Sequence, residues 1–425
     1  MPHVPARLEA LKTRQRKGET SLPGDRSLGS PMLGLVWFGA SVSLAEILTG
    51  TFFAPLGFEQ GMLAVIVGHA IGCVLFWLVS YLSAKTGRSA MEAVRLSFGR
   101  HGAKAFSVAN VAQLVGWTAI MIASGAAAAA YLVPILGMLG WCLVIGALIV
   151  LWIAVGLQKM GYLQSIAAAL LAVLCAVVSV TVFGDGAAAG AAGAAAGAAA
   201  EGGDALSFGA AVELAVAMPL SWLPVVGDYT RQAKRPLAGS LAASVMYTLG
   251  SCWMFAIGLG CALYAGTDDI AVVLAQAGMG AVGILVVVFS TVTTTFLDAQ
   301  SAGQSAEAIH PRLTARACGV VAAVVGTALA IFAPVGNFEE FLYLIGSVFA
   351  PLAAIVIVDF LVLRRDVSET PVDWANIALW VAGFALYRIS LAWDIPCGNT
   401  LPVMLAIAVA TVCVRKVLDA AGRRA

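Results

Sequence analysis

The chain reads as a series of long apolar stretches separated by short polar segments. Twelve stretches approach or exceed the roughly 20 apolar residues that an α-helix needs to cross a bilayer. They are 32–56, 61–84, 105–133, 137–157, 162–183, 206–227, 239–264, 279–301, 315–333, 340–363, 372–391 and 400–416. The chain is 61% hydrophobic and 11% charged, whereas soluble domains carry about 25% charged residues. The sequence therefore predicts an all-α integral membrane protein with 12 transmembrane helices.

The basic residues are distributed unevenly between the two sides of these predicted spans. With the N-terminus in the cytoplasm, the inner segments contain 23 of the 24 Lys and Arg residues, as the positive-inside rule requires. The first 30 residues are polar and basic and lack an apolar stretch of signal-peptide length. We expect a multi-pass protein of the cell inner (plasma) membrane with both termini in the cytoplasm.

Two polar loops indicate an internal repeat. The loop 85–104 carries an apolar stripe at Met91, Val94 and Phe98, which predicts a short helix at the inner interface. Residues 268–278 predict a similar helix on the outer side, five spans later. This pattern favours two inverted repeats of five spans each, an architecture of transporters. The predicted parts are an N-terminal tail 1–30, a first repeat 31–183, an Ala/Gly-rich extracytoplasmic linker 184–205, a second repeat 206–365, two further spans 366–417 and a C-terminal tail 418–425.

The first apolar stretch is polar in its middle. Residues 39–46 read GASVSLAE, with two hydroxyls and the Glu46 carboxylate at membrane depth. A membrane-centred acid costs on the order of 3 kcal/mol, and small and polar residues there are typical of a broken helix that lines a cavity. In a purely structural alternative, Ser41 and Ser43 bond to their own helix and Glu46 pairs with a neighbouring helix. We interpret this stretch as half of a central binding site.

Spans three and six contain further candidate groups. Span three has Asn110, Gln113, Trp117 and Met121 at helical spacing, so that an indole lies one turn from an amide. This combination suits a planar heteroaromatic ligand, although a lone tryptophan in a span is more often used for packing or as an interface anchor. In span six, two prolines five residues apart flank Trp222 and predict a second helix break.

Span eight ends in a run of hydroxyl side chains. Ser290, Thr293 and Thr294 share one helix face, and Asp298 follows one turn later. Hydroxyls and freed carbonyls are hard oxygen ligands that suit a small cation such as Na⁺. Alternatively, the threonines bond back to their own helix or pack between helices.

Other polar groups in the spans have simpler interpretations. We interpret His69 as a hydrogen-bonded structural group, and Asp359 with Arg364 and Arg365 as an anchoring cluster. The sequence contains no CxxC pair, HExxH motif or Ser/His/Asp arrangement. We therefore expect neither an enzyme nor a cofactor, and the only ion in the prediction is a coupling Na⁺ or H⁺.

Several motifs resemble, in order and spacing, those of the nucleobase–cation symporters of the first family, which share the LeuT-like fold. The motifs are Trp37-Phe38-Gly39, Pro55-Leu56-Gly57, Gly116-Trp117 with Gly125, Gly227-Asp228-Tyr229-Thr230-Arg231, Thr293-Thr294, Ser301-Ala302-Gly303, and the stretch from Leu342 to Arg365 followed by Asp373-Trp374. The resemblance covers nearly the whole chain. It implies a five-plus-five inverted repeat with broken helices 1 and 6, two C-terminal helices, and secondary active transport by alternating access.

The resemblance also implies roles for individual residues. The carbonyls of Gly39, Val42 and Ser290 and the hydroxyls of Thr293 and Thr294 would form a sodium site. Trp117 would stack on the substrate ring, and the carboxylates would accept hydrogen bonds from an amine or a ring N–H. The candidate substrate-binding residues are Ser43, Glu46, Gln113, Trp117, Met121, Trp222 and Asp298.

Two positions depart from the pattern of the family. Met121 stands where hydantoin-type members carry a glutamine, and Thr295 stands where many members carry an asparagine. The Ser-Leu-Ala-Glu pattern of span one looks most like the branch thought to take up hydroxymethylpyrimidine, a thiamine precursor. We therefore expect import of this or another pyrimidine-type base by Na⁺ or H⁺ symport.

Other substrates remain alternatives at this point. One is a cytosine-, purine- or hydantoin-type nucleobase. An amine or amino-acid symporter ranks lower, because Glu46 would repel the carboxylate of an amino acid. The expected partners are the small-molecule substrate, the coupling cation and membrane lipid, with no nucleic acid and no obligatory protein partner.

Overall fold

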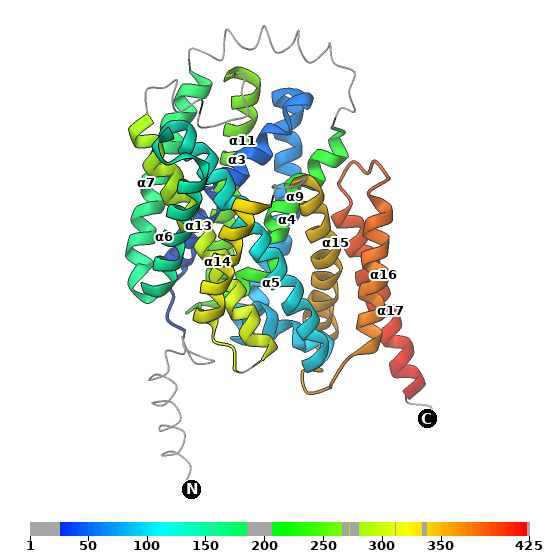
Figure 1. Ribbon diagram of the computed structural model, residues 1–425. Coiled ribbons are helices and arrows are strands. Elements are labelled where there is room, and N and C mark those ends of the chain that lie inside the picture. The colour runs from blue at the N-terminus through cyan, green and yellow to red at the C-terminus, as the bar shows by residue number, and fades with distance from the viewer. Residues whose placement is uncertain are drawn as a thin grey trace.

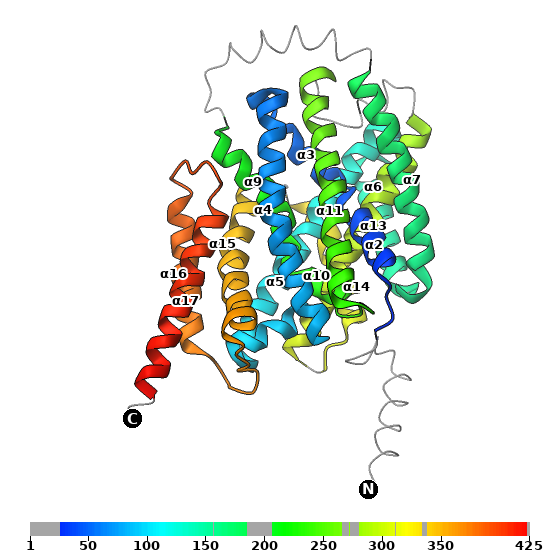
Figure 2. The same ribbon diagram turned by 180° about the vertical axis from the view of Figure 1, so that it is seen from behind.

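The computed structural model describes residues 26–155, 157–184, 206–265, 272, 280–310, 312–333 and 338–422. These residues form a bundle of helices that run side by side (Figure 1, Figure 2). The helices are α2 (Ser30–Ser41), α3 (Leu44–Thr51), α4 (Gly57–Thr86), α5 (Ala90–Leu132), α6 (Gly137–Val155), α7 (Leu157–Phe183), α9 (Phe208–Ser221), α10 (Leu223–Thr230), α11 (Pro236–Gly260), α13 (Gly280–Ile309), α14 (Ala315–Phe332), α15 (Phe338–Ile357), α16 (Trp374–Ser390) and α17 (Thr400–Gly422). Short 3₁₀ turns η1 (Ala54–Leu56) and η2 (Pro134–Leu136) and π-helical turns η3 (Cys261–Ala265) and η4 (Val358–Leu363) adjoin them.

The lengths and composition of these helices confirm a multi-pass membrane protein. In the part of the chain that the structure describes, eight helices are long and apolar enough to cross a membrane, and the bent pair α2–α3 makes up to nine. Helices α7, α13 and α16 lie where three further spans are predicted, so the total of 12 stays a prediction. Most of the N-terminal tail, and nearly all of the linker 184–205 and of the loop 268–278, lie outside the described residues.

Burial separates a central helix pair from a periphery. The apolar segment of the α9–α10 span is 94% buried inside the protein, whereas the corresponding segments of α14 and α17 are each only 28% buried. Helix α9 packs on α4 and α15, α2 packs on α11, and α5 packs on α13. Helices α16 and α17 stand at one side of the bundle, and α6 and α7 stand at the other (Figure 1). The described chain begins and ends at the same end of the bundle (Figure 2).

The first predicted span consists of two helices with different directions. Helix α2 ends at Ser41, α3 begins at Leu44, and the two are bent by 51°. Ser43 caps α3, because its side chain accepts a hydrogen bond from the Glu46 N–H at 3.3 Å. The Ser43 N–H donates to the Ser41 carbonyl, so it does not form the helical bond to the Gly39 carbonyl four residues back. In span six, α9 and α10 meet at Trp222 but form one candidate span, Phe208–Thr230, without a comparable bend.

The predicted short helix in the loop 85–104 is present as the first turns of α5. Ser89 and Glu92 form a capping box at its start. Its apolar stripe at Met91, Val94 and Phe98 is buried in the protein core. It ends at Gly99, whose φ of 76° suits glycine and where a Cβ would lie 2.6 Å from a backbone oxygen.

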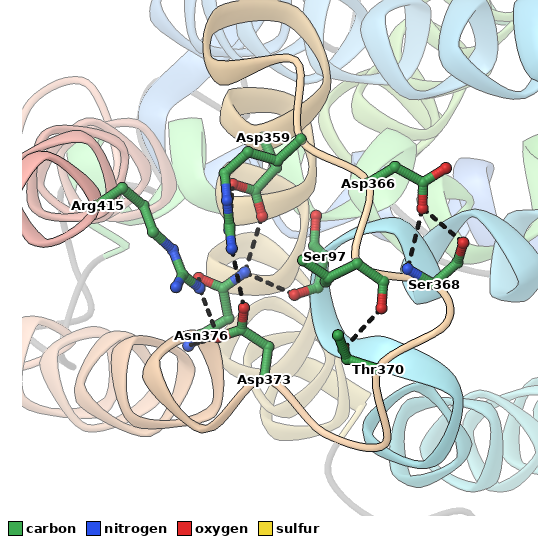
Figure 3. Close-up of polar contacts among 10 residues, drawn as sticks. Ser97, Asp359, Asp366, Ser368, Thr370, Asp373, Asn376 and Arg415 are labelled. Carbon is green, nitrogen blue, oxygen red and sulfur yellow. Dashed lines mark hydrogen bonds and ion pairs between the residues drawn. The ribbon is translucent and has the colours of Figure 1, made fainter. Parts of the chain in front are cut away.

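A polar cluster ties the end of α15 to its neighbours (Figure 3). Arg365 pairs with Asp359 and with Asp373, each at 3.2 Å. Asn376 donates to Asp359 at 2.8 Å and to the Ser97 carbonyl on α5 at 2.7 Å. The predicted anchoring cluster therefore exists for Arg365. Arg364, which was predicted to belong to the same cluster, is instead exposed and has a φ of 52°.

The Asp373 carboxylate, which starts α16, has a lowered pKa. Partial burial alone would raise this pKa, but hydrogen bonds from Arg415 at 2.5 Å, from the Asn376 N–H and from Arg365 outweigh burial. A folded-state pKa below the ordinary value of 3.8 means that the carboxylate stabilises the fold above that pH. This stabilisation is lost as the pH falls through the folded-state pKa.

We expect Asp373→Asn to lower the free energy of unfolding at neutral pH by about 1–3 kcal/mol, because a charged hydrogen-bond acceptor is lost. Thermal unfolding of the purified protein measures this difference, which should shrink as the pH falls below 3.8. The exposed Asp419→Asn is the matched control. A pH-independent difference between wild type and Asp373→Asn would contradict the electrostatic explanation.

Candidate functional site

A small cavity lies between the break of the first span, α5, the junction of α9 and α10, and α13. Its volume is about 10 Å³, which is room for about one water. A planar base therefore enters only if the lining side chains move apart. The lining residues are Ser43, Ala45, Glu46, Trp117, Met121, Met218, Ser221, Trp222, Thr294 and Asp298.

Six of the seven residues that the sequence suggested for substrate binding line this cavity. The exception is Gln113, whose Nε2 donates to Asn110 Oδ1 at 2.8 Å and to the Ser221 carbonyl at 3.2 Å. Gln113 thereby holds the end of α9 next to the cavity. Its Oε1 is buried and has no partner among the described residues. Met218 and Ser221 were not predicted to line the site, although both belong to the proline-interrupted stretch of span six.

Two tryptophans form the aromatic part of the cavity. Trp117 is held edge-on by Phe338 and Phe341, with ring centroids 5.7 Å and 5.5 Å away. Trp222 contacts Trp37 in the same edge-on manner at 5.4 Å. These contacts fix the orientation of both indoles, and the Trp117 Nε1 is buried without a partner among the described residues.

Asp298 supplies one of the two carboxyl groups of the cavity. Its side chain lines the cavity and is 3% exposed, and it makes no hydrogen bond or ion pair with any residue that the structure describes. A buried carboxylate without a partner is costly. This position therefore favours a proton, a cation or a ligand N–H group beside Asp298.

Glu46 is the second acid of the cavity, and unlike Asp298 it is hydrogen-bonded on both oxygens. Tyr247 donates to Oε1 at 2.6 Å, and the Ser251 hydroxyl lies 2.6 Å from Oε2. Both partners come from α11, one turn apart. Neither was predicted from the sequence, although two hydroxyl side chains at i and i+4 in an apolar span form a recognisable polar face.

Two of the candidate cation ligands, Val42 and Ser290, meet where α2 ends against α13. The Ser290 hydroxyl donates to the Val42 carbonyl at 2.9 Å. The Thr293 hydroxyl bonds back to its own helix, where the Phe289 and Ser290 carbonyls lie at 2.8 Å and 3.1 Å. Thr294 Oγ1 is buried without a partner in the described part of the chain. The helix break also releases the Gly39 carbonyl. Hydroxyl and carbonyl oxygens are the type of ligand that a small hard cation prefers.

Comparison with known proteins identifies the family. Residues 30–386 match the family described as permeases for cytosine/purines, uracil, thiamine and allantoin. The chain belongs to this family. The cytosine permease of Escherichia coli strain K12 is 26% identical over 395 residues, which cover 92% of this chain and 89% of that permease. The resemblance noted in the sequence is thus confirmed at the level of the family, a family of permeases and not of enzymes.

Solved structures confirm the LeuT-like fold. Mhp1, a nucleobase-cation-symport-1 family transporter in a closed conformation with bromovinylhydantoin bound, gives a TM-score of 0.77 at 19% identity, over 92% of this chain and 93% of that one. A substrate-bound, outward-open Na⁺-coupled sialic acid symporter gives a TM-score of 0.71 at 14% identity, over 95% and 93% of the two chains. The hydroxymethylpyrimidine branch stays a prediction.

The relative position of Trp117 and Asp298 depends on close packing of α5 on α13. A Cβ added at Gly125 would lie 2.5 Å from Thr291 Oγ1 and 2.9 Å from its Cγ2. We expect Gly125→Ala to separate the two helices and to cost about 1–3 kcal/mol in stability.

Thermal unfolding and ligand-induced stabilisation measure the effect of Gly125→Ala. Gly102→Ala on the same helix is the matched control, because the nearest atom to its added Cβ is 3.3 Å away on Phe98. If Gly125→Ala and Gly102→Ala have the same unfolding temperature and the same ligand-induced shift, the close packing of α5 on α13 does not position the site.

Proposed function

We propose that this permease imports a pyrimidine-type nucleobase or a related precursor, foremost hydroxymethylpyrimidine, together with a cation by alternating access. The observation that carries the proposal is the composition of one buried cavity. There the oriented Trp117 indole lies with two carboxylates, Glu46 and Asp298. A ring that stacks on the indole and offers an amine to a carboxylate satisfies both features.

Hydroxymethylpyrimidine has the groups that this cavity favours. Its ring is planar, and its amine and hydroxymethyl group donate hydrogen bonds. Asp298 has no hydrogen-bond or ion-pair partner among the described residues and is buried. It therefore supplies an acceptor that penalises a ligand lacking a donor at that position. The Ser43 hydroxyl, at the start of α3, adds a polar contact at the cavity edge.

Cytosine is the second candidate, since it also combines a planar ring with an exocyclic amine. The similarity to the cytosine permease favours it. Met121 and Thr295, which depart from the pattern of other members, argue against recognition of cytosine in an unchanged form. An amino acid fits less well, because its carboxylate would face both acids of the cavity.

The coupling ion under this proposal is Na⁺ or H⁺. A sodium ion would bind the carbonyls of Gly39, Val42 and Ser290 and the hydroxyls of Thr293 and Thr294. Entry of one positive charge supplies about 2.3 kcal/mol per 100 mV, which concentrates a neutral substrate roughly fiftyfold. The chain would lie in the cell inner membrane with cytoplasmic termini, and 31–183 and 206–365 would form the two inverted repeats.

We expect hydroxymethylpyrimidine to raise the unfolding temperature of the purified protein, because a ligand that binds only the folded state stabilises it. Cytosine, uracil, hydantoin and thiamine are tested in parallel, each with and without sodium. Trp117→Ala should abolish the shift, and Trp374→Ala, at a side chain 74% exposed, should keep it. If no planar base shifts the transition under any ion condition, the nucleobase assignment is wrong.

Asp298→Asn should weaken binding of an amine-bearing base by roughly tenfold to a hundredfold, since hydrogen bonds to charged groups contribute about 1.5–3 kcal/mol. Isothermal calorimetry on the detergent-purified protein measures the change in Kd. Asp419→Asn, at an exposed position on α17, is the control. Unchanged affinity in Asp298→Asn would show that the amine binds elsewhere.

A further inference from the structure

We infer that Glu46, Ser251 and His69 form a proton-binding relay beside the cavity. The relay deepens the proposed function, on which it rests, by naming a proton as a coupling ion of the same site. Its three members come from three helices, α3, α11 and α4, and all are buried, with exposures of 1%, 0% and 0%. Glu46 also lines the cavity, so the relay reaches the place where a substrate would bind.

The geometry of the relay is a continuous chain of short polar contacts. His69 Nδ1 lies 2.9 Å from the Val65 carbonyl, and His69 Nε2 lies 2.6 Å from Ser251 Oγ. Ser251 Oγ lies 2.6 Å from Glu46 Oε2. At the other oxygen of the same carboxyl, Tyr247 donates at 2.6 Å.

The hydrogen bonds of the relay need one more hydrogen than a neutral imidazole, a hydroxyl and an ionised carboxylate supply together. A carbonyl only accepts, so His69 Nδ1 carries a hydrogen, and Nε2 of a neutral imidazole then carries none. Ser251 has one hydroxyl hydrogen for two contacts of 2.6 Å. If it donates to His69, the contact with Glu46 needs a protonated carboxyl. If it donates to Glu46, the contact with His69 needs an imidazolium.

The surroundings favour the neutral arrangement, with the proton on Glu46. An ionised pair in a buried site pays a desolvation cost of several kcal/mol per ion. The titratable groups that face Glu46, besides His69, are Tyr247 and Cys252 from α11 and Cys73 from α4, with Asp298 across the cavity. None of them is a Lys or Arg, so no basic side chain among the described residues neutralises an ionised Glu46, and a proton can do so.

Proton occupancy also affects how α3 is held. With the proton present, the relay links α3 through α11 to α4, and His69 is fixed further by its edge-on contact with Phe255 at 4.9 Å. Without the proton, one of the two contacts of 2.6 Å lies between acceptors that share no hydrogen, and it opens. Protonation therefore stabilises α3 in this position beside the cavity. His69, interpreted from sequence as a structural group, has a second role at the end of the relay.

Infrared difference spectroscopy of the purified full-length protein tests the relay without any transport. We expect the carbonyl band of a protonated carboxylic acid at neutral pH. Glu46→Gln should remove this component, and Ser251→Ala should shift its frequency by removing the hydroxyl that accepts from it. Asp419→Asn, at an exposed position on α17, is the matched control that should leave it in place. If the carboxylic acid bands of wild type and Glu46→Gln are identical at neutral pH, the relay is refuted.

Uptake into proteoliposomes separates the relay from the proposed function. A proton gradient without sodium should drive uptake of hydroxymethylpyrimidine or cytosine, and Glu46→Gln and His69→Gln should reduce this uptake at least tenfold. His101→Gln, at an exposed position, should match wild type. Uptake driven by sodium alone and indifferent to the proton gradient overturns the relay but keeps the symporter. If no base is taken up under either gradient, the proposed function fails, and the infrared band still decides the relay.

Discussion

A helix that stops inside an apolar span must find partners for its freed backbone groups without water. In this protein the first span stops at Ser41 and restarts at Leu44. Capping by Ser43 satisfies the start of α3, and the Ser290 hydroxyl satisfies the Val42 carbonyl. The same break turns α3 so that Glu46 lines the cavity. The cavity, the candidate cation site and the proton relay all depend on this interruption.

The position of α3 after the break is set by close packing on α11. A Cβ at Gly258 would lie 1.9 Å from the Ile47 carbonyl oxygen, and a Cβ at Gly50 would lie 2.4 Å from the Phe255 carbonyl oxygen. Only glycine permits this approach. It brings the Glu46 carboxyl within hydrogen-bond distance of the hydroxyl side chains on α11. Small residues at helix contacts are the usual means of close packing in membranes.

Much of this arrangement is predictable from the sequence, because its signals are local. Polar residues at mid-span, such as Glu46 and Asp298, are costly enough in an apolar segment that their presence predicts a functional site. The partners of Glu46 were not predicted, since they depend on which helix faces α3, and the spacing within one span does not contain that information. The exposure of Arg364 was missed for a similar reason, because the backbone turns at that residue to a φ of 52°.

Binding of a planar base between the break in the first span and α13 is the step on which the proposed transport depends. Electron cryo-microscopy of the full chain with hydroxymethylpyrimidine, or with cytosine if that base binds more tightly, would locate the bound ring. We expect the cavity to open and hold the ring against the Trp117 indole, with the amine at hydrogen-bond distance from Asp298 or Glu46. A base bound outside this cavity, or bound inside it away from Trp117 and both acids, would contradict the proposed site.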